Sequence, residues 1–266
     1  MDQPIAVSPV EHTAAIPPDP KEEATRPPAS DLYDVMSTMR AMRRLKPEPV
    51  PREVIERLIR AASWAPSGGN SQTARYIVVD DRTQIARIAP LCRRAQRFYI
   101  TAQADACPPT MSPEQFQRTL AAGQHLADHF EDVPALIVVC CDVSSNMHAW
   151  LAHTGSVARA FRDLGIRRAV TGGANFAKFG RLSIAASVYP AVQNLLLAAR
   201  ESGLGASLTT THLMFERELK DILGLPRNVR TFALVPIGYP LGRFGPVNRA
   251  PVEHFLQWNH WQQRPE

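Results

Sequence analysis

The loop Ala65–Gln72 has the residues best suited to bind a planar polar ligand. It reads Ala-Pro-Ser-Gly-Gly-Asn-Ser-Gln and lies between a helical pattern that ends near Trp64 and a strand pattern at 76–79. Paired glycines let a backbone approach a ligand closely, and the amides of Asn70 and Gln72 can donate and accept hydrogen bonds. A heterocycle with donors and acceptors on its edge fits these groups. A polar turn between a helix and a strand explains the loop equally well.

The second chemical group is a set of arginines in Met39–Arg44. Apolar residues at helical spacing predict an amphipathic helix that starts with Ser30 as its N-cap and stops by Pro47. On a helix, Arg40, Arg43 and Arg44 lie within one turn of each other and roughly on one side. Guanidiniums that close repel one another unless an anion lies among them. The alternative is that they face water and complement the negative end of the helix dipole.

The composition predicts a soluble globular protein. The chain has 266 residues, of which 45% are hydrophobic and 21% are charged, so it can bury a full core. Its first residues lack the basic and apolar regions of a signal peptide, and no apolar run approaches membrane-spanning length. We therefore expect a cytoplasmic protein without membrane contact.

Neither the cysteines nor the histidines predict a metal site. The four cysteines are Cys92, Cys107, Cys140 and Cys141. Their spacing matches neither zinc ligands nor a redox pair, and the last two lie in an apolar run where thiols usually act as small core residues. His148 and His153 are five residues apart and have no acidic partner at ligand spacing. We expect no metal and no disulfide.

The basic balance of the chain does not by itself identify a partner. A net charge of +5 and a pI near 9.3 are compatible with nucleic-acid binding. However, the arginines are interleaved with acids along most of the chain, and no aromatic-basic recognition motif is present. An anionic small molecule explains a local excess of arginine as well, so we expect no nucleic-acid partner.

Periodicity and turn residues predict a mixture of helices and strands. Buried strands are expected at 75–80, 133–141 and 231–238. Helices are expected at about 51–64, at 83–103 with an interruption at Pro90, from Ser112, at 187–202 and at 215–223. For the helix at 187–202, Ser187 is the expected N-cap and Pro190 lies in the tolerated first turn. This helix is apolar around nearly its whole circumference, which predicts burial in a core or at a subunit interface.

The domain organisation follows from proline content and patterning. Residues 1–30 contain seven of the 23 prolines and no apolar periodicity, so we expect an extended or disordered tail. One domain is expected at 31–257, and a second short tail at 258–266. Within the domain, residues of about 144–186 form either a lid with a glycine pair at 172–173 or a surface excursion with one or two short helices.

Taken in order, these parts resemble the FMN-dependent nitroreductase family. The motifs are Met39–Arg44, the loop Ala65–Gln72 followed by a strand, the apolar helix ending in Gly203-Leu204-Gly205, and Gly238-Tyr239-Pro240 with Arg249-Ala250-Pro251. The resemblance extends from about Asp31 to Phe255. It implies an α+β fold, with a central, mainly antiparallel sheet flanked by helices, and an intertwined homodimer. Two FMN sites would lie at the subunit interface, each built from both chains.

The resemblance also implies a reaction. Hydride would pass from NADH or NADPH to FMN, and an electron-poor small aromatic acceptor such as a nitroaromatic or a quinone would then be reduced in a ping-pong cycle. FMN carries this chemistry, and the protein supplies placement and electrostatics. No side-chain acid, base or nucleophile is required, so no catalytic residue is assigned.

By position in the family, the cofactor-binding residues fall into three groups. Arg40, Arg43 and Arg249 would hold the FMN phosphate, with Arg44 and Arg243 as further contacts, since guanidiniums pair bidentately with phosphate. From the loop, Pro66, Ser67 and Gly68 would contribute close contact, and Asn70 and Gln72 would bond the flavin ring. Gly205 and Ala206 would lie close to the isoalloxazine. Ala41 completes the set, although many members have Ser at this position.

Departures from the family pattern narrow the function. Relatives that fragment FMN carry Asp where this chain has Ala41, and halotyrosine deiodinases use a Glu, Tyr, Lys trio with no convincing equivalent at 144–185. Thr73-Ala74 replaces the usual Pro-Trp after the loop glutamine. A quinone or nitroaromatic reductase therefore remains, with the dehalogenase and the FMN-fragmenting synthase disfavoured. A flavin-binding carrier or sensor without turnover stays open, as does a polyanion binder that uses the basic surface.

Overall fold

The computed structural model describes residues 31–144 and 154–261. The tail expected at 1–30, His148, His153 and the last five residues lie outside this range. Within it, four strands form one antiparallel sheet in the order β1-β2-β4-β3. The strands are β1 (Ala74–Val79), β2 (Ala135–Asp142), β3 (Gly205–Ala206) and β4 (Val229–Gly238). The predicted α+β class with a mainly antiparallel sheet is confirmed.

The two central strands are the core of the molecule because both of their faces are covered. In β2 every residue except Asp142 is buried, as the continuous apolar run predicted. Ile137 and Val139 pack with one set of helices, and Leu136 and Val138 pack with another, because successive strand residues point to opposite faces. The thiols Cys140 and Cys141 are free and fully buried, in line with the prediction that they are core residues.

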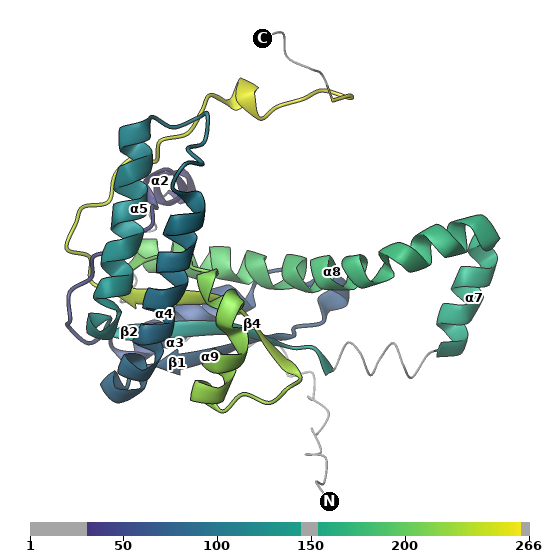
Figure 1. Cartoon of the computed structure of the whole chain (residues 1–266), viewed down its shortest axis with the longest axis horizontal. Coiled ribbons are helices and arrows are strands. Elements are labelled where there is room, and N and C mark those ends of the chain that lie inside the picture. The colour runs from purple at the N-terminus through teal and green to yellow at the C-terminus, as the bar shows by residue number, and fades with distance from the viewer. Residues whose placement is uncertain (1–30, 145–153, 262–266) are drawn as a thin grey trace, which may run out of the picture.

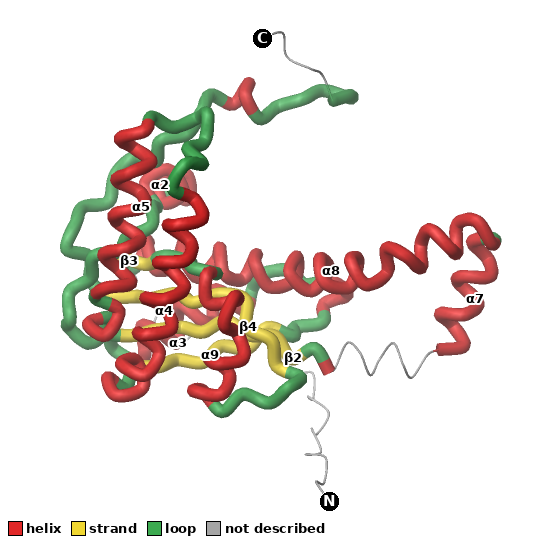
Figure 2. Tube along the Cα trace, viewed as in Figure 1, coloured by secondary structure: helices red, strands yellow, loops and turns green. Residues whose placement is uncertain are grey.

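Helices cover each face of the sheet (Figures 1 and 2). One face packs against α3 (Arg52–Ser63) and α8 (Ile166–Glu201), through residues such as Leu58 and Leu195. The other face packs against α4 (Arg82–Gln103), α5 (Pro113–Asp128) and α9 (Glu216–Leu223). Ser112 and Gln115 form the capping box predicted at the start of α5. The interruption predicted at Pro90 is wrong, since α4 continues through it.

Helix α8 is longer than predicted and projects from the body with α7 (Thr154–Leu164) folded back at its tip (Figure 1). Ser187 is not its N-cap but lies inside the helix, where its hydroxyl donates to the carbonyl of Ser183 at 2.9 Å. Pro190 therefore lies mid-helix. The segment Lys178–Glu201 is apolar and long enough to cross a membrane by composition and length alone, although its C-terminal part belongs to the core with Leu195 fully buried.

The arginine segment Met39–Arg44 is extended, not helical. Helix α2 (Leu32–Thr38) begins after Asp31, whose carboxylate caps Tyr33, and ends before the arginines. The amide of Met42 donates to the carbonyl of Ala206 at 2.9 Å, and that of Leu241 donates to the carbonyl of Arg44 at 3.0 Å. These bonds to β3 and to the chain after β4 replace the helical ones, so tertiary pairing outweighs helix propensity. The predicted clustering of three arginines on one helical turn is wrong.

Candidate functional site

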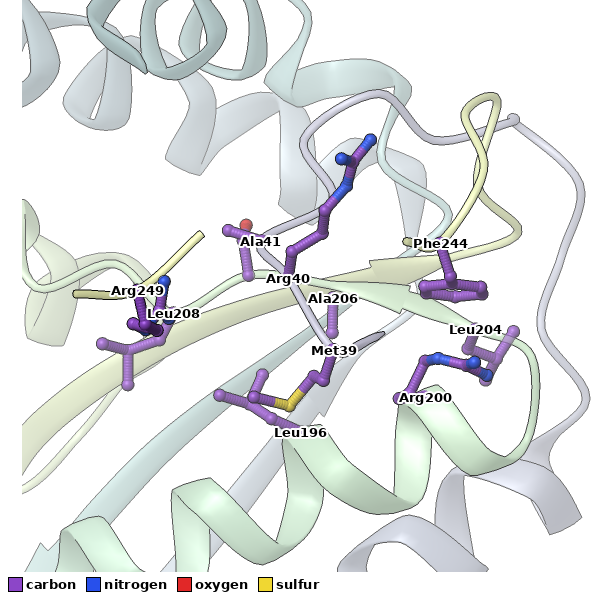
Figure 3. Close-up of a pocket in the computed structure, with 11 residues that line it drawn as sticks. Met39, Arg40, Ala41, Leu196, Arg200, Leu204, Ala206, Leu208, Phe244 and Arg249 are labelled. Carbon is purple, nitrogen blue, oxygen red and sulfur yellow. The ribbon is translucent and has the colours of Figure 1, made fainter. Parts of the chain in front are cut away.

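A pocket of about 200 Å³ lies where four segments meet (Figure 3). The segments are the extended residues Met39–Ala41, the C-terminal turns of α8 at Leu196 and Arg200, the chain around β3 at 204–208, and the C-terminal segment at Phe244 and Arg249. The sheet and α8 hold two of these walls rigidly. The other two are extended segments tied on by backbone bonds, including one from the amide of Val247 to the carbonyl of Ser37 at 2.8 Å.

The pocket joins residues that are far apart in the sequence. Of the residues assigned by resemblance, it brings together Arg40, Ala41, Ala206 and Arg249. Arg43, Arg44, Arg243 and Gly205 do not line it, and neither does any residue of the loop Ala65–Gln72. The structure thus joins the two ends of the predicted arginine set, one from before the first strand and one from after the last.

The lining of the pocket is cationic. It contains three guanidiniums, those of Arg40, Arg200 and Arg249, and no carboxylate. Within the described ranges, the side chains of Arg40 and Arg249 make no ion pair, and Arg249 donates only to the neighbouring carbonyl of Asn248 at 2.8 Å. Figure 3 shows the guanidinium of Arg40 pointing away from Leu196. Both exposed arginines can therefore turn toward an anion without breaking an ion pair.

A buried hydroxyl adds a donor to this lining. Ser207 is 2% exposed, lines the pocket, and its Oγ has no hydrogen-bond partner among the residues described. An unpaired buried hydroxyl costs stability, so such groups normally have a partner. A ligand with acceptor oxygens would satisfy it. Free guanidiniums and an unpaired hydroxyl are the donor set that a phosphate needs, so the pocket fits the phosphate end of FMN.

Three of the predicted arginines lie elsewhere. Arg43 is half-buried, and burial lowers its pKa, with a smaller opposing effect from Tyr99. Arg44 and Arg243 are exposed. None of the three lines the pocket.

Gly205 has a reason to be glycine within its own chain. A Cβ there would lie 2.9 Å from Leu45 Cδ2, 2.9 Å from Met42 Cβ and 3.1 Å from Pro240 Cβ. The close approach of the arginine segment to β3 therefore requires a residue without a side chain. Ala206, the next residue, lines the pocket.

The loop Ala65–Gln72 is held against α8 in an unusual backbone conformation. The amide of Gly68 donates to Ser187 Oγ at 3.0 Å, and that of Gln72 donates to Ser67 Oγ at 3.1 Å. Asn70 and Gln72 have φ values of 51° and 46°, in the left-handed region that non-glycine residues seldom adopt. Their side chains are exposed, as is Pro66. Strained residues held in place by neighbours often mark functional loops.

The loop and the pocket lie at separate positions along α8. Ser187 anchors the loop and Arg200 lines the pocket. The pocket residues Leu196 and Arg200 are nine and thirteen positions after Ser187, which corresponds to about 14 and about 20 Å along the helix at 1.5 Å per residue. One chain therefore presents the two halves of the predicted site as two separate surfaces.

Sequence reasoning missed Arg200, Ser207 and Phe244. Arg200 lies at the end of a helix that was predicted from its apolar residues alone, and Ser207 lies two residues after the Gly-Leu-Gly turn. A basic residue in the last turn of a largely apolar helix was the available signal for Arg200. Phe244 gave none, because it lies in an irregular segment.

Comparison with known proteins agrees with the family resemblance of the sequence. The sequence model of the nitroreductase family matches residues 37–239. The chain is 27% identical over 252 residues to NADH dehydrogenase of Thermus thermophilus, which covers 89% of this chain and 99% of that protein. It is 24% identical over 220 residues to iodotyrosine deiodinase 1 of Rattus norvegicus, covering 82% of this chain and 65% of that protein. The chain thus spans about two thirds of the length of this deiodinase.

A solved structure has the same fold. Oxidized iodotyrosine deiodinase bound to FMN and 3-iodo-L-tyrosine superposes with a TM-score of 0.58 at 21% identity, covering 87% of this chain and all of that one. At 21% identity, this similarity shows that the two chains share a fold, and it shows nothing about a shared substrate. The described residues contain no group of three or more His, Cys, Asp or Glu side chains placed to hold a metal ion.

Proposed function

The chain belongs to the nitroreductase family, and on that premise we propose that it is an FMN-dependent oxidoreductase that takes hydride from NADH or NADPH and reduces nitroaromatics or quinones. The same proposal places it in the cytoplasm as a homodimer. Membership of this family supports FMN as the cofactor. The similarity to a protein named NADH dehydrogenase supports a nicotinamide as the hydride donor.

The observation that carries the proposal is the cationic pocket. Arg40 and Arg249, which form no ion pair within the described chain, and the unpaired hydroxyl of Ser207 would hold the FMN phosphate. Ala206 keeps the adjacent wall small. Bound FMN would supply the chemistry of accepting and donating hydride. The protein needs no acid or base for this, so its part is to bind, to orient and to exclude water.

The loop Ala65–Gln72 would serve the other end of the cofactor. The exposed amides of Asn70 and Gln72 offer donors and acceptors to a ring system that has both. Because the loop and the pocket of one chain are about 14 to 20 Å apart along α8, we propose that each FMN takes its phosphate site from one subunit and its loop from the other. The exposed apolar residues Phe179 and Leu182 of α8 support such a subunit contact.

The test combines a spectrum with a turnover assay. Purified protein should show the visible absorption of a flavin, and the FMN-loaded protein should oxidise NADH or NADPH when a nitroaromatic or a quinone is present. Protein that is colourless and does not bind added FMN would refute the proposal. Protein that binds FMN without turnover would be a carrier or sensor, and the reductase assignment would be wrong.

Reductive dehalogenation is the second candidate, because the deiodinase of rat is among the relatives. Against it, residues 144–185 contain no Glu and no Tyr, so the side chains that clamp the amino-acid part of an iodotyrosine have no equivalent there. Release of iodide from 3-iodotyrosine by the dithionite-reduced protein would favour this candidate. We expect no release under conditions in which a nitroaromatic is reduced.

A further inference from the structure

Arg200 contacts two of the segments that close the pocket. Its Nε donates to Thr38 Oγ1 at 3.0 Å, and one of its terminal nitrogens lies 3.9 Å from the carboxylate of Asp34. The centre of its guanidinium lies 4.3 Å from the centroid of the Phe244 ring. Figure 3 shows Arg200 beneath this ring. The side chain of Arg200 is 19% exposed.

Each contacted segment carries one of the pocket's other arginines. Thr38 ends α2 two residues before Arg40, and Phe244 lies five residues before Arg249. Thr38 is the last residue of the short helix α2 and Phe244 lies in an irregular segment, whereas Arg200 extends from the C-terminal turns of α8, which belongs to the core. Arg200 is thus a side-chain link between the core helix α8 and both of these segments.

The contacts use the planar shape of the guanidinium. Its edge donates to Thr38, whose own hydroxyl donates to the carbonyl of Asp34 at 2.7 Å and so offers its lone pairs to Arg200. Its face lies against Phe244, an arrangement that favours arginine and is worth more as solvent is excluded. A lysine keeps the charge but has neither the flat face nor the forked donors.

We propose that Arg200 is a positioning residue that sets the phosphate site: by holding Thr38 and Phe244 to α8, it brings Arg40 and Arg249 within reach of one phosphate group. This inference rests on the proposed function, because it takes the FMN phosphate as the ligand. It adds a residue whose contribution to phosphate binding passes through Thr38 and Phe244.

The test compares FMN with riboflavin, which lacks the phosphate. Dissociation constants of both are measured on the apo-protein by flavin fluorescence. For Arg200→Gln we expect FMN binding about tenfold weaker, since one charge-assisted contact is worth at least that factor, and riboflavin binding unchanged within about twofold. Arg217→Gln is the matched control, because Arg217 is exposed on α9 and makes no contact with the pocket. It should leave both constants unchanged.

Three further variants distinguish positioning from direct charge. Thr38→Val and Phe244→Leu change no charge, yet each should weaken FMN binding selectively and should add little when combined with Arg200→Gln, since all three break the same link. Arg200→Lys should recover only part of the lost affinity. Full recovery with lysine, or unchanged FMN affinity in Thr38→Val and Phe244→Leu, would overturn the positioning role.

Three other outcomes can be distinguished from one another. Equal weakening of FMN and riboflavin by Arg200→Gln would mean a general structural role, and the inference would be wrong while the proposed function stands. If the wild-type chain bound riboflavin and FMN equally, the phosphate site itself would be refuted. If the wild-type chain bound neither flavin, the proposed function would fail together with this inference.

Discussion

At the scale of single residues, substitutions in the cationic pocket and in the loop Ala65–Gln72 should affect different properties of the bound FMN. Arg40 offers charge to a phosphate, whereas Asn70 offers an amide to a ring system. We therefore expect Arg40→Ala mainly to lose FMN, by about tenfold or more in affinity, and Asn70→Ala mainly to shift the flavin reduction potential. Fluorescence titration and a spectroscopic redox titration measure the two effects. Wild-type behaviour in both variants would remove these residues from the site.

His212 is a buried residue whose protonation should affect stability. It is 1% exposed, its Nε2 lies 3.2 Å from Thr231 Oγ1, and its Nδ1 has no hydrogen-bond partner among the residues described. Burial lowers the pKa of His212 to about 4, against a smaller opposing effect of Glu216. The folded protein therefore holds this imidazole neutral at a pH at which the unfolded chain would protonate it.

The consequence is a loss of stability in mild acid. Because the folded pKa lies below the unfolded value of about 6.5, the unfolded state binds more protons between these values, and stability falls as the pH drops through this window. We expect about 2 kcal/mol less stability at pH 5 than at pH 7 from this residue. Urea unfolding at both pH values measures it. His212→Gln should flatten the dependence, and an unchanged slope in this variant would assign the effect to other groups.

At the scale of elements, the sequence predicted those whose signal is local. The strand β2 follows from a continuous apolar run, and the start of α5 follows from a capping box read residue by residue. The prediction of a helix over the arginine segment was wrong, because this segment pairs instead with residues near 206 and 240. No local pattern in the sequence reveals that pairing. The start of α8 was misplaced for a related reason: Ser187 resembles a cap, but its hydroxyl bonds within the helix and to the loop.

The candidate site could be predicted from the sequence only in part. Family position placed Arg40, Ala41, Ala206 and Arg249, and the structure brings these into one pocket. Arg200 could not be placed, because its role depends on a ring 44 residues later in the chain. The spacing of residues in the sequence indicates only which side chains are close within one element. The pocket, in contrast, depends on how β3 and the C-terminal segment pack together in the fold.

The pairing of β3 with the arginine segment gives a prediction about Gly205. A methyl group there would lie within 3.0 Å of Leu45 and Met42 side-chain atoms, so the segment must shift. We expect Gly205→Ala to destabilise the fold by about 1 to 3 kcal/mol and to weaken FMN binding. Gly180→Ala is the control, since a Cβ there meets nothing within 4 Å and the change favours a helix. Thermal unfolding compares them. Wild-type stability in Gly205→Ala would contradict the tight pairing.

At the scale of the whole molecule, the projecting helix calls for a partner surface. Leu182 is 59% exposed on α8 and Phe179 is 55% exposed, while further along the same helix Leu195 is fully buried in the core. The C-terminal segment also leaves the body and exposes Trp258 and Trp261 (Figure 1). Apolar surface of this kind usually marks an interface. We propose a second copy of the chain as the partner, since it would also complete the separated site.

Dimerisation and FMN binding should therefore be lost together. A charge at a buried subunit contact is costly, so we expect Leu182→Glu to shift the protein from dimer to monomer in light scattering, with loss of FMN although Leu182 does not line the pocket. Phe98→Glu is the matched control, because Phe98 is 58% exposed on α4, which covers the opposite face of the sheet. The Phe98→Glu protein should remain a dimer and should retain its FMN. A monomeric Leu182→Glu protein that retains FMN with wild-type affinity would show that one chain suffices for the site.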